Sequence, residues 1–376
     1  MSLKVLIAGD FCPQDRVVEA FENNEFSVVL GEAKEQIAQV DYSLVNFECP
    51  LTYNGEKPVI KSGPSLQCSI KGLEAVKWAG FDGVTLANNH FLDYGEEGAK
   101  NTLDACNQLQ LEHVGGGMNL SEASIVLYKK LKGLTLAVIN CCENEFSIAT
   151  EHSAGSCPLS PIDQFYKIKE AKEKADFVIV IVHGGIEFFN LPSPRMQQTY
   201  RFFIDAGADA VINHHQHCLS GYEVYKEKPI FYGLGNFCFD RKGKRKDNWN
   251  EGYLVSLTLE KEEKPEYDII PYIQCDDNPC ILFVDKDNML EKIQELNRII
   301  QSPDLLVKEN SLFIEKNKGI YLLSLEPYTG HLGGLRERKI LPSLLSKKYF
   351  LRLYGYLICE SHFDRLKEIL KKEIYG

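Results

Sequence analysis

An α/β fold with a largely parallel sheet is predicted by two features of the sequence. From residue 3 to about residue 240, short β-branched runs alternate with longer amphipathic segments. Glycines such as Gly80 and Gly207 fall where the amphipathic segments should start or end as helices. Strands that alternate with helices are typical of parallel strands joined by helical crossovers.

Each expected element follows from the spacing of its apolar residues. Short continuous apolar runs indicate buried strands, and apolar residues at helical spacing indicate the helices that cover them. The expected strands are residues 5–8, 43–47, 84–87, 134–139, 177–182, 210–212 and 230–232. The expected helices are residues 70–79, 96–108, 161–175 and 195–206. Residues 253–259 and 267–274 alternate apolar and polar side chains around a charged turn at 260–265, so they predict an antiparallel hairpin.

Composition and patterning set the expected domain organisation. The 376 residues are 44% hydrophobic and 25% charged, which is ordinary for a soluble globular protein with a sizeable core. After about residue 284 the sequence becomes helical and charged in character. We therefore predict an α/β domain over residues 1–280 and a mostly helical C-terminal extension over residues 281–376.

Several classes of protein are disfavoured by the same bulk properties. A net charge of −11 argues against a general nucleic-acid binder, because phosphate binding is driven by lysine and arginine. The N-terminal apolar run is too short for a secretory signal, and no run reaches the roughly 18 apolar residues that a membrane helix needs. As written, the chain is expected to be cytoplasmic and to have no membrane span. Its twelve cysteines include no Cys-x-x-Cys pair, which favours buried reduced thiols over a zinc ribbon.

Polar residues gather where five of the apolar runs end. Because the carboxyl ends of parallel strands lie along one edge of a sheet, residues that follow different strands should meet there. Five of the nine histidines belong to this group. The group is Asp10, Asn46, Glu48, Asn88, Asn89, His90, His183, His214, His215 and His217.

This mixture of side chains predicts a transition-metal site. Imidazole nitrogen with carboxylate and amide oxygen suits zinc, manganese or iron rather than calcium. More than four such ligands indicate two ions roughly 4 Å apart, a spacing that clamps the attacking and leaving oxygens of a displacement. His214 is expected to face away from His215 and His217, since neighbours along a strand point to opposite sides. A serine hydrolase and a P-loop protein are disfavoured, because neither Gly-x-Ser-x-Gly nor Gly-x-x-x-x-Gly-Lys occurs.

The motifs around these residues also carry a family resemblance. Over residues 3 to 240, and in this order, the chain contains "GDF", "VNFECPLT", "TLANNHFLDYG", "HGGIE" and "HHQH" followed by "YEVYKEKPIFYGLGNFCFD". Together they resemble the successive motifs of the CapA, or poly-γ-glutamate, family of capsule synthesis proteins. That family is similar to the calcineurin-like metallophosphoesterases. The resemblance implies an α/β/β/α sandwich, in which two sheets pack face to face and helices cover both outer sides.

The resemblance further implies a divalent transition-metal cofactor of one or two ions, whether manganese, zinc or iron. Glu48 stands where the phosphoesterases place a bridging aspartate. Cys12 stands where they have a histidine, so the first of the two sites would have one imidazole fewer. The implied metal ligands are Asp10, Glu48, Asn89, His183, His215 and His217.

Catalytic and substrate-binding residues complete the expected site. The resemblance implies that His90 is the general acid or a donor to the transition state, oriented by Asp93. The run Arg241 to Lys246 has five cations in six residues, and it is either a solvated loop or a grip for an anionic substrate. The expected substrate-binding residues are Asn46, Asn88, Glu187, Arg241 and Lys242.

The functional expectation is a metal-dependent hydrolase-like protein of capsule or exopolymer biosynthesis. A metal-activated water would attack a phosphoester or a γ-glutamyl amide while His90 protonates the leaving group. Two alternatives stay open at this point: a non-catalytic polymer-binding component of capsule assembly, and a phosphoesterase of small molecules. The expected partners are an anionic polymer or a phosphorylated substrate, together with other capsule biosynthesis proteins, and no nucleic acid is expected.

Overall fold

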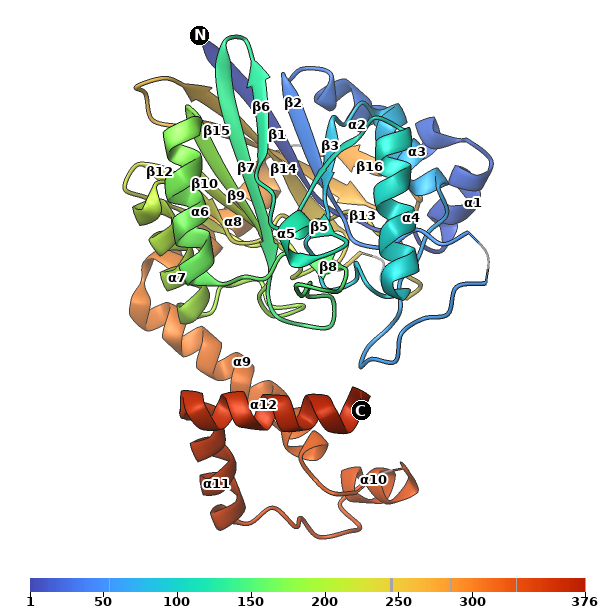
Figure 1. Ribbon diagram of the computed structural model, residues 1–376, viewed down its shortest axis with the longest axis vertical. Helices are drawn as coiled ribbons and strands as arrows, with labels where there is room; N and C mark the ends of the chain where they lie inside the picture. The colour runs from blue at the N-terminus through green and yellow to red at the C-terminus, as the bar shows by residue number, and fades with distance from the viewer. Residues whose placement is uncertain (54, 244–245, 285, 329, 376) are drawn as a thin grey trace. The chain divides into compact units, whose positions relative to one another are not determined.

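A computed structural model describes residues 1–376 except 54, 244–245, 285, 329 and 376 (Figure 1). The chain divides into two compact units, Met1–Val307 and Lys308–Gly376. The first unit contains both large sheets, and the second contains only helices among the residues that are described.

The first sheet begins with parallel strands and is completed by an antiparallel hairpin. Its order is β16-β15-β14-β1-β2-β3-β4, with β13 paired to the end of β1. The strands β1 to β4 run parallel, and β14, β15 and β16 are antiparallel to their neighbours. The bounds are β1 Ser2–Phe11, β2 Tyr42–Phe47, β3 Gly83–Thr85, β4 Glu112–Val114, β13 Asn236–Cys238, β14 Glu251–Glu260, β15 Glu266–Gln274 and β16 Ile281–Phe283.

The second sheet has a parallel centre and antiparallel edges. Its order is β11-β12-β10-β9-β7-β6, in which β7, β9, β10 and β12 are parallel. The bounds are β6 Leu127–Leu131, β7 Leu134–Cys142, β9 Phe177–His183, β10 Ala210–His214, β11 Tyr222–Tyr225 and β12 Lys228–Phe231. A small pair joins β5, Gly116–Gly117, to β8, Gly155–Ser156.

Helices cover the outer face of each sheet, which confirms the predicted α/β/β/α sandwich (Figure 1). On the first sheet lie α1 Arg16–Glu22, α2 Phe26–Ile37, α3 Lys71–Ala79 and α4 Gly95–Gln108. On the second lie α6 Pro161–Lys174 and α7 Pro194–Ala206, and the short α5 Leu120–Ala123 packs on the β5–β8 pair. Both α6 and α7 begin with a serine cap followed by proline, which leaves no unpaired N–H at the first helical position.

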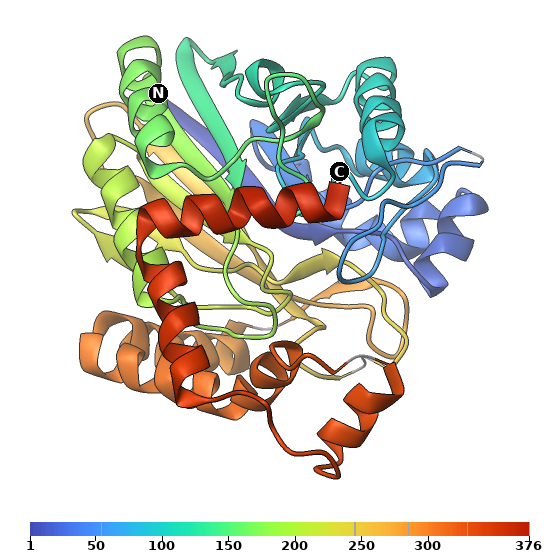
Figure 2. The ribbon, with the colours of Figure 1, turned by 60° about the horizontal axis from the view of Figure 1, so that its bottom comes forward.

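The single parallel sheet read from the sequence is thus divided between two sheets. The expected strands all form, and the hairpin is β14 and β15. Five shorter or less apolar strands, β4, β6, β11, β13 and β16, join them. The strand ends that carry the polar residues still face one side of the molecule, and in Figure 2 the loops that follow them come toward the viewer.

The first unit continues past residue 280, where the sequence placed the boundary. β16 extends the first sheet, and α8, Lys286–Gln301, packs against β11 and β15. Asn297 of α8 accepts a hydrogen bond from the Tyr222 N–H at 2.6 Å, and the Ile300 carbonyl accepts one from Gln197 Nε2 at 2.9 Å. These contacts and the buried side chains of α8 extend the compact unit to Val307.

The C-terminal unit is helical, as predicted. Its helices are the greater part of α9 Pro303–Ser324, with α10 Gly330–Glu337, α11 Lys347–Ile358 and α12 Glu360–Tyr375. Within the described part of the chain, no helix combines the length and the apolar character needed to cross a membrane. All twelve cysteines are free thiols and ten of them are buried, as the sequence analysis expected.

Candidate metal centre

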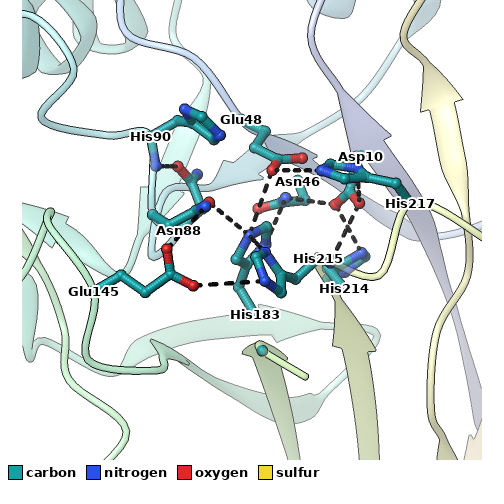
Figure 3. Close-up of polar contacts among 12 residues, drawn as sticks. Asp10, Asn46, Glu48, Asn88, His90, Glu145, His183, His214, His215 and His217 are labelled. Atoms are coloured by element: carbon teal, nitrogen blue, oxygen red, sulfur yellow. Dashed lines mark hydrogen bonds and ion pairs between the residues drawn. The ribbon is translucent and has the colours of Figure 1, made fainter. Parts of the chain in front are cut away.

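Strand register brings the expected ligands together from both sheets. In the first sheet Asp10 pairs in register with Asn46, and Glu48 follows at the end of β2. In the second sheet His183 ends β9 and pairs in register with His214 at the end of β10. The strand ends of both sheets carry side chains that point toward one another, so the predicted single rim is shared by two sheets (Figure 3).

A glycine lets the backbone approach Asp10 closely. The Asp10 N–H donates to the Gly235 carbonyl at 3.2 Å, where the chain comes back beside β1 as β13. A Cβ at Gly9 would lie 2.0 Å from that carbonyl oxygen, so no other residue fits there without a shift. This contact fixes the strand end from which the Asp10 carboxylate projects.

The group of candidate ligands called the second ligand group is formed by Glu48, His183 and His215. Their ligand atoms all lie within 4.8 Å of one another. His183 Nε2 lies 3.1 Å from His215 Nδ1, 3.5 Å from Glu48 Oε1 and 3.1 Å from Asn89 Oδ1. Two imidazoles, a carboxylate and an amide oxygen therefore converge on one point, as the sequence predicted.

The other group, called the first ligand group, is formed by Asp10, Glu48 and His217. Here too the ligand atoms lie within 4.8 Å of one another. His217 Nδ1 lies 3.4 Å from Asp10 Oδ2, and its Nε2 lies 3.5 Å from Glu48 Oε1. Glu48 belongs to both groups, which is the position of a bridging ligand.

The Glu48 carboxyl group is buried and lacks hydrogen-bond donors among the described residues. Neither of its oxygens has a hydrogen-bond partner among the residues that the structure describes. Burial raises the pKa of Glu48 well above its usual value, and the neighbouring Asp10 adds to the effect. A buried acid with no donor calls for a cation, and the mixed nitrogen and oxygen donors around it suit a divalent transition metal. The residues therefore fit the cofactor that the sequence predicts.

Three of the other ligands, Asp10, His183 and His215, are held in the states that bind metal. For His217, burial would lower the pKa, but the hydrogen bond with Asp10 and the Asp10 charge outweigh burial and raise that pKa. Burial alone would raise the pKa of Asp10, but the hydrogen bond from His217 and the charges of His214 and His183 outweigh it, so that pKa is lowered. Burial lowers the pKa of His183 and of His215, and each is lowered further by a neighbouring imidazole. Ionised carboxylate and neutral imidazole are the forms that coordinate divalent ions.

The backbone turns sharply through the histidine cluster. His215 has φ of 93° and His217 has φ of 53°, both in the left-handed region that residues with side chains rarely adopt. The turn directs the His215 N–H to Asp10 Oδ2 at 3.3 Å. His214, the last residue of β10, belongs to neither ligand group, and its Nδ1 lies 3.5 Å from Asp10 Oδ1 (Figure 3).

His90 lies beside the ligands and is oriented by Asp93. His90 Nδ1 and Asp93 Oδ2 are 2.6 Å apart, and Asp93 Oδ2 also accepts from the Leu66 N–H at 2.6 Å. Burial lowers the pKa of His90, although Asp93 opposes that effect. Because Nδ1 is taken by Asp93, Nε2 is the ring nitrogen available for proton transfer.

Comparison with known proteins identifies the family. The family model for "Bacterial capsule synthesis protein PGA_cap" matches residues 4–241. The chain belongs to this family. Capsule biosynthesis protein CapA of Bacillus anthracis is 33% identical over 277 residues, covering 72% of this chain and 67% of that protein. PGA biosynthesis protein CapA of Bacillus subtilis (strain 168) is 34% identical over 263 residues, covering 69% and 68%. The crystal structure of a novel phosphatase from Mycoplasma pneumoniae aligns with a TM-score of 0.44 and 17% identity, covering 74% of this chain and 95% of that one.

In this PGA_cap protein, two of the expected substrate-binding residues lie beneath the site. Asn46 Nδ2 donates to Asp10 Oδ1 at 2.7 Å and lies 3.2 Å from His183 Nδ1. Asn88 is fully buried, and its side chain pairs with the Phe47 carbonyl and the His90 N–H. Both amides form hydrogen bonds with neighbouring site residues, and their predicted contact with substrate stays a prediction.

The other three expected substrate-binding residues of the PGA_cap protein are exposed. Glu187 follows β9 on the surface, close enough for its charge to act on Glu48, His215 and His217. The Arg241 guanidinium lies 5.0 Å from the centre of the Trp249 ring. Lys242 donates its N–H to Asp15 at 2.6 Å. Within the basic run, positions 244 and 245 lie outside the described residues.

Sequence reasoning missed two side chains that contact this site. Lys61 Nζ lies 3.3 Å from His90 Nδ1 and forms an ion pair with Asp93, although its segment carries no periodic pattern that could have indicated burial. Glu145 contacts Asn89 and His215 from the loop after β7. A signal for Glu145 existed, because "NCCENE" places polar residues after an apolar run just as the other strand ends do.

Replacing Lys61 in this PGA_cap protein should destabilise the fold. Its side chain is only 3% exposed, so Lys61→Met would remove the ion-pair partner of Asp93 Oδ1 and leave the buried carboxylate with hydrogen bonds at Oδ2 only. Breaking a buried ion pair on one side typically costs about 3–5 kcal/mol. We expect a loss of that size in the free energy of unfolding, measured by urea denaturation with a chelator present. Lys100→Met is the matched control, because the Lys100–Asp104 pair is exposed and should change stability little. Equal stabilities would show that Lys61 does not compensate Asp93.

Proposed function

We propose that this PGA_cap protein is a divalent-metal-dependent hydrolase of capsule polymer biosynthesis. The observation that carries the proposal is the sharing of Glu48 by two ligand groups, one with His183 and His215 and one with Asp10 and His217. A carboxylate between two such groups is the arrangement of centres that activate water and stabilise an in-line displacement. The names of the Bacillus relatives support a place in the capsule or poly-γ-glutamate pathway.

The residues of the site would have different roles in the reaction. Two divalent ions, when bound, would lower the pKa of a coordinated water and polarise the oxygen of the bond to be cleaved. Glu48, His183, His215, Asn89, Asp10 and His217 would hold them. His90 in its imidazolium form, whose charge Asp93 stabilises at Nδ1, would give the Nε2 proton to the leaving group and become neutral. Asn46 and Asn88 position Asp10, His183 and the His90 backbone from below.

An anionic substrate is favoured by the cation beside the first ligand group. Arg241 is exposed, and its guanidinium lies over the ring of Trp249. That ring lies 5.0 Å from the imidazole of His217, so the positive charge is held next to a proposed ligand. A planar guanidinium pairs well with carboxylate or phosphate oxygens. A γ-glutamyl polymer and a phosphorylated substrate both provide such groups.

Elemental analysis followed by hydrolysis assays tests the proposal. Purified protein should retain up to two equivalents of manganese, zinc or iron. In their presence it should cleave either a model phosphodiester, bis-p-nitrophenyl phosphate, or a γ-glutamyl oligomer, and chelation should abolish the activity. Metal without hydrolysis of either substrate, combined with binding of poly-γ-glutamate, would favour a polymer-binding assembly component instead. Protein that binds no metal would contradict the proposal.

A further inference from the structure

The carboxylate of Glu145 lies in the site but has no role in the proposed reaction. Glu145 Oε2 accepts a hydrogen bond from Asn89 Nδ2 at 3.3 Å, and Glu145 Oε1 lies 3.6 Å from His215 Nε2 (Figure 3). Asn89 and His215 are proposed ligands of the same ion. The Glu145 side chain is 35% exposed, so it lies at the mouth of the site rather than in the core.

The loop that carries Glu145 is tied to the backbone on both sides of the ligand group. At its start, the Glu143 N–H donates to the His183 carbonyl at 3.0 Å. At its end, the buried Ser147 hydroxyl donates to the Asn89 carbonyl at 2.7 Å and accepts from the Leu92 N–H at 3.1 Å. Because these bonds link the loop to the backbones of two proposed ligands, the position of Glu145 relative to the site is fixed.

Glu145 determines which end of the Asn89 amide faces the ligands. An ionised carboxylate only accepts hydrogen bonds, so the NH₂ group of Asn89 must point to Glu145. The amide oxygen then points the other way, and it lies 3.1 Å from His183 Nε2. The flipped amide would set its oxygen against the carboxylate and its NH₂ group toward the ion. Only the observed orientation makes Asn89 an oxygen ligand.

The same carboxylate acts on the tautomer of His215. His215 Nδ1 lies on the inner side of the ligand group, 3.1 Å from His183 Nε2, whereas Nε2 faces Glu145. A carboxylate beside Nε2 favours the proton on that atom and leaves the lone pair on Nδ1 for a metal. Carboxylate partners of this kind orient metal-binding histidines in many sites.

We propose that Glu145 is a positioning residue of the second ligand group. It orients the Asn89 oxygen and the His215 Nδ1 lone pair toward the ion that these two residues would hold together with Glu48 and His183. The inference rests on the proposed function only in requiring that the centre binds metal. It assigns to Glu145 no contact with the ion itself.

Metal titration of Glu145→Gln tests the inference. The substitution keeps the size of the side chain but leaves one acceptor oxygen and one NH₂ donor, so residue 145 can no longer accept from both Asn89 Nδ2 and His215 Nε2. By calorimetric titration of chelator-treated protein with Mn²⁺, we expect the ion at the second group to bind about 10- to 100-fold more weakly. The ion at the first group should bind as in the wild type. The absorption spectrum of the Co²⁺-loaded protein should change as well, because an oxygen ligand is lost or displaced.

A variant in the same loop provides the control. Glu143→Gln removes a carboxylate that pairs with Arg195 and the Gly185 N–H and with no proposed ligand side chain, so it should bind both ions as the wild type does. Circular dichroism of the metal-free variants should show unchanged folding. Wild-type affinity and an unchanged Co²⁺ spectrum in Glu145→Gln would overturn the inference about Glu145 but not the proposed function. A wild-type protein that binds no ion would overturn the proposed function and this inference together.

Discussion

Glu48→Gln is expected to abolish binding of both metal ions. Glu48 is shared by the two ligand groups, so its loss removes a ligand from each, whereas loss of Asp10 or His183 would affect one directly. The effect should exceed the roughly 10- to 100-fold that loss of an outer partner costs. Elemental analysis after dialysis against a defined free-metal concentration measures it. Glu151→Gln, at an exposed carboxylate, should retain the wild-type metal content. Two equivalents of metal in Glu48→Gln would exclude a bridging role.

The same substitution should change how the stability of the metal-free protein depends on pH. Burial raises the pKa of Glu48 in the folded state above its ordinary value of 4.5. The folded state then binds more protons than the unfolded state between those two pKa values, so the contribution of Glu48 is fully present below pH 4.5 and is lost as pH rises through the raised pKa. In chelator, the wild type should therefore lose stability relative to Glu48→Gln across that range. Parallel pH profiles of the two unfolding free energies would show that Glu48 is not the buried, uncompensated acid.

The positions of the site residues were predictable because each follows an apolar run. A strand that is buried on both faces leaves a visible run of apolar residues, and the first polar residue after it must lie at an end of the sheet. Asp10, Glu48 and His183 were found in this way. The division of the strands between two sheets was implied by the family resemblance but not by the apolar pattern, because strand pairing is non-local: β1 pairs with β13 and β14, which lie far along the chain.

The positions of three side chains in the site depend on contacts that the sequence pattern does not indicate. Alternation along the strand predicted that His214 faces away from His215 and His217, but it could not show that His214 Nδ1 lies beside Asp10, because Asp10 belongs to the other sheet. Lys61 could not be recognised, because its burial depends on contacts with Asp93 and His90 rather than on any pattern in its own segment. Polar residues after β7 were visible in the sequence, but only the structure shows that the side chain of Glu145, rather than that of Glu143, contacts ligand side chains.

His90→Asn is expected to retain the metal and lose nearly all turnover. Nδ1 of His90 is bonded to Asp93, and His90 belongs to neither group of converging ligand atoms, so its removal should leave metal content unchanged. Asparagine keeps a polar side chain of similar reach but cannot transfer a proton near neutral pH. General acid catalysis typically contributes roughly 10²- to 10⁴-fold, and a fall of that size in kcat is expected on whichever substrate the wild type cleaves. His152→Asn, at a histidine that is 92% exposed, should leave kcat unchanged. Loss of metal in proportion to activity in His90→Asn would instead make His90 a ligand, and the division of roles between His90 and the converging histidines would have to be reversed.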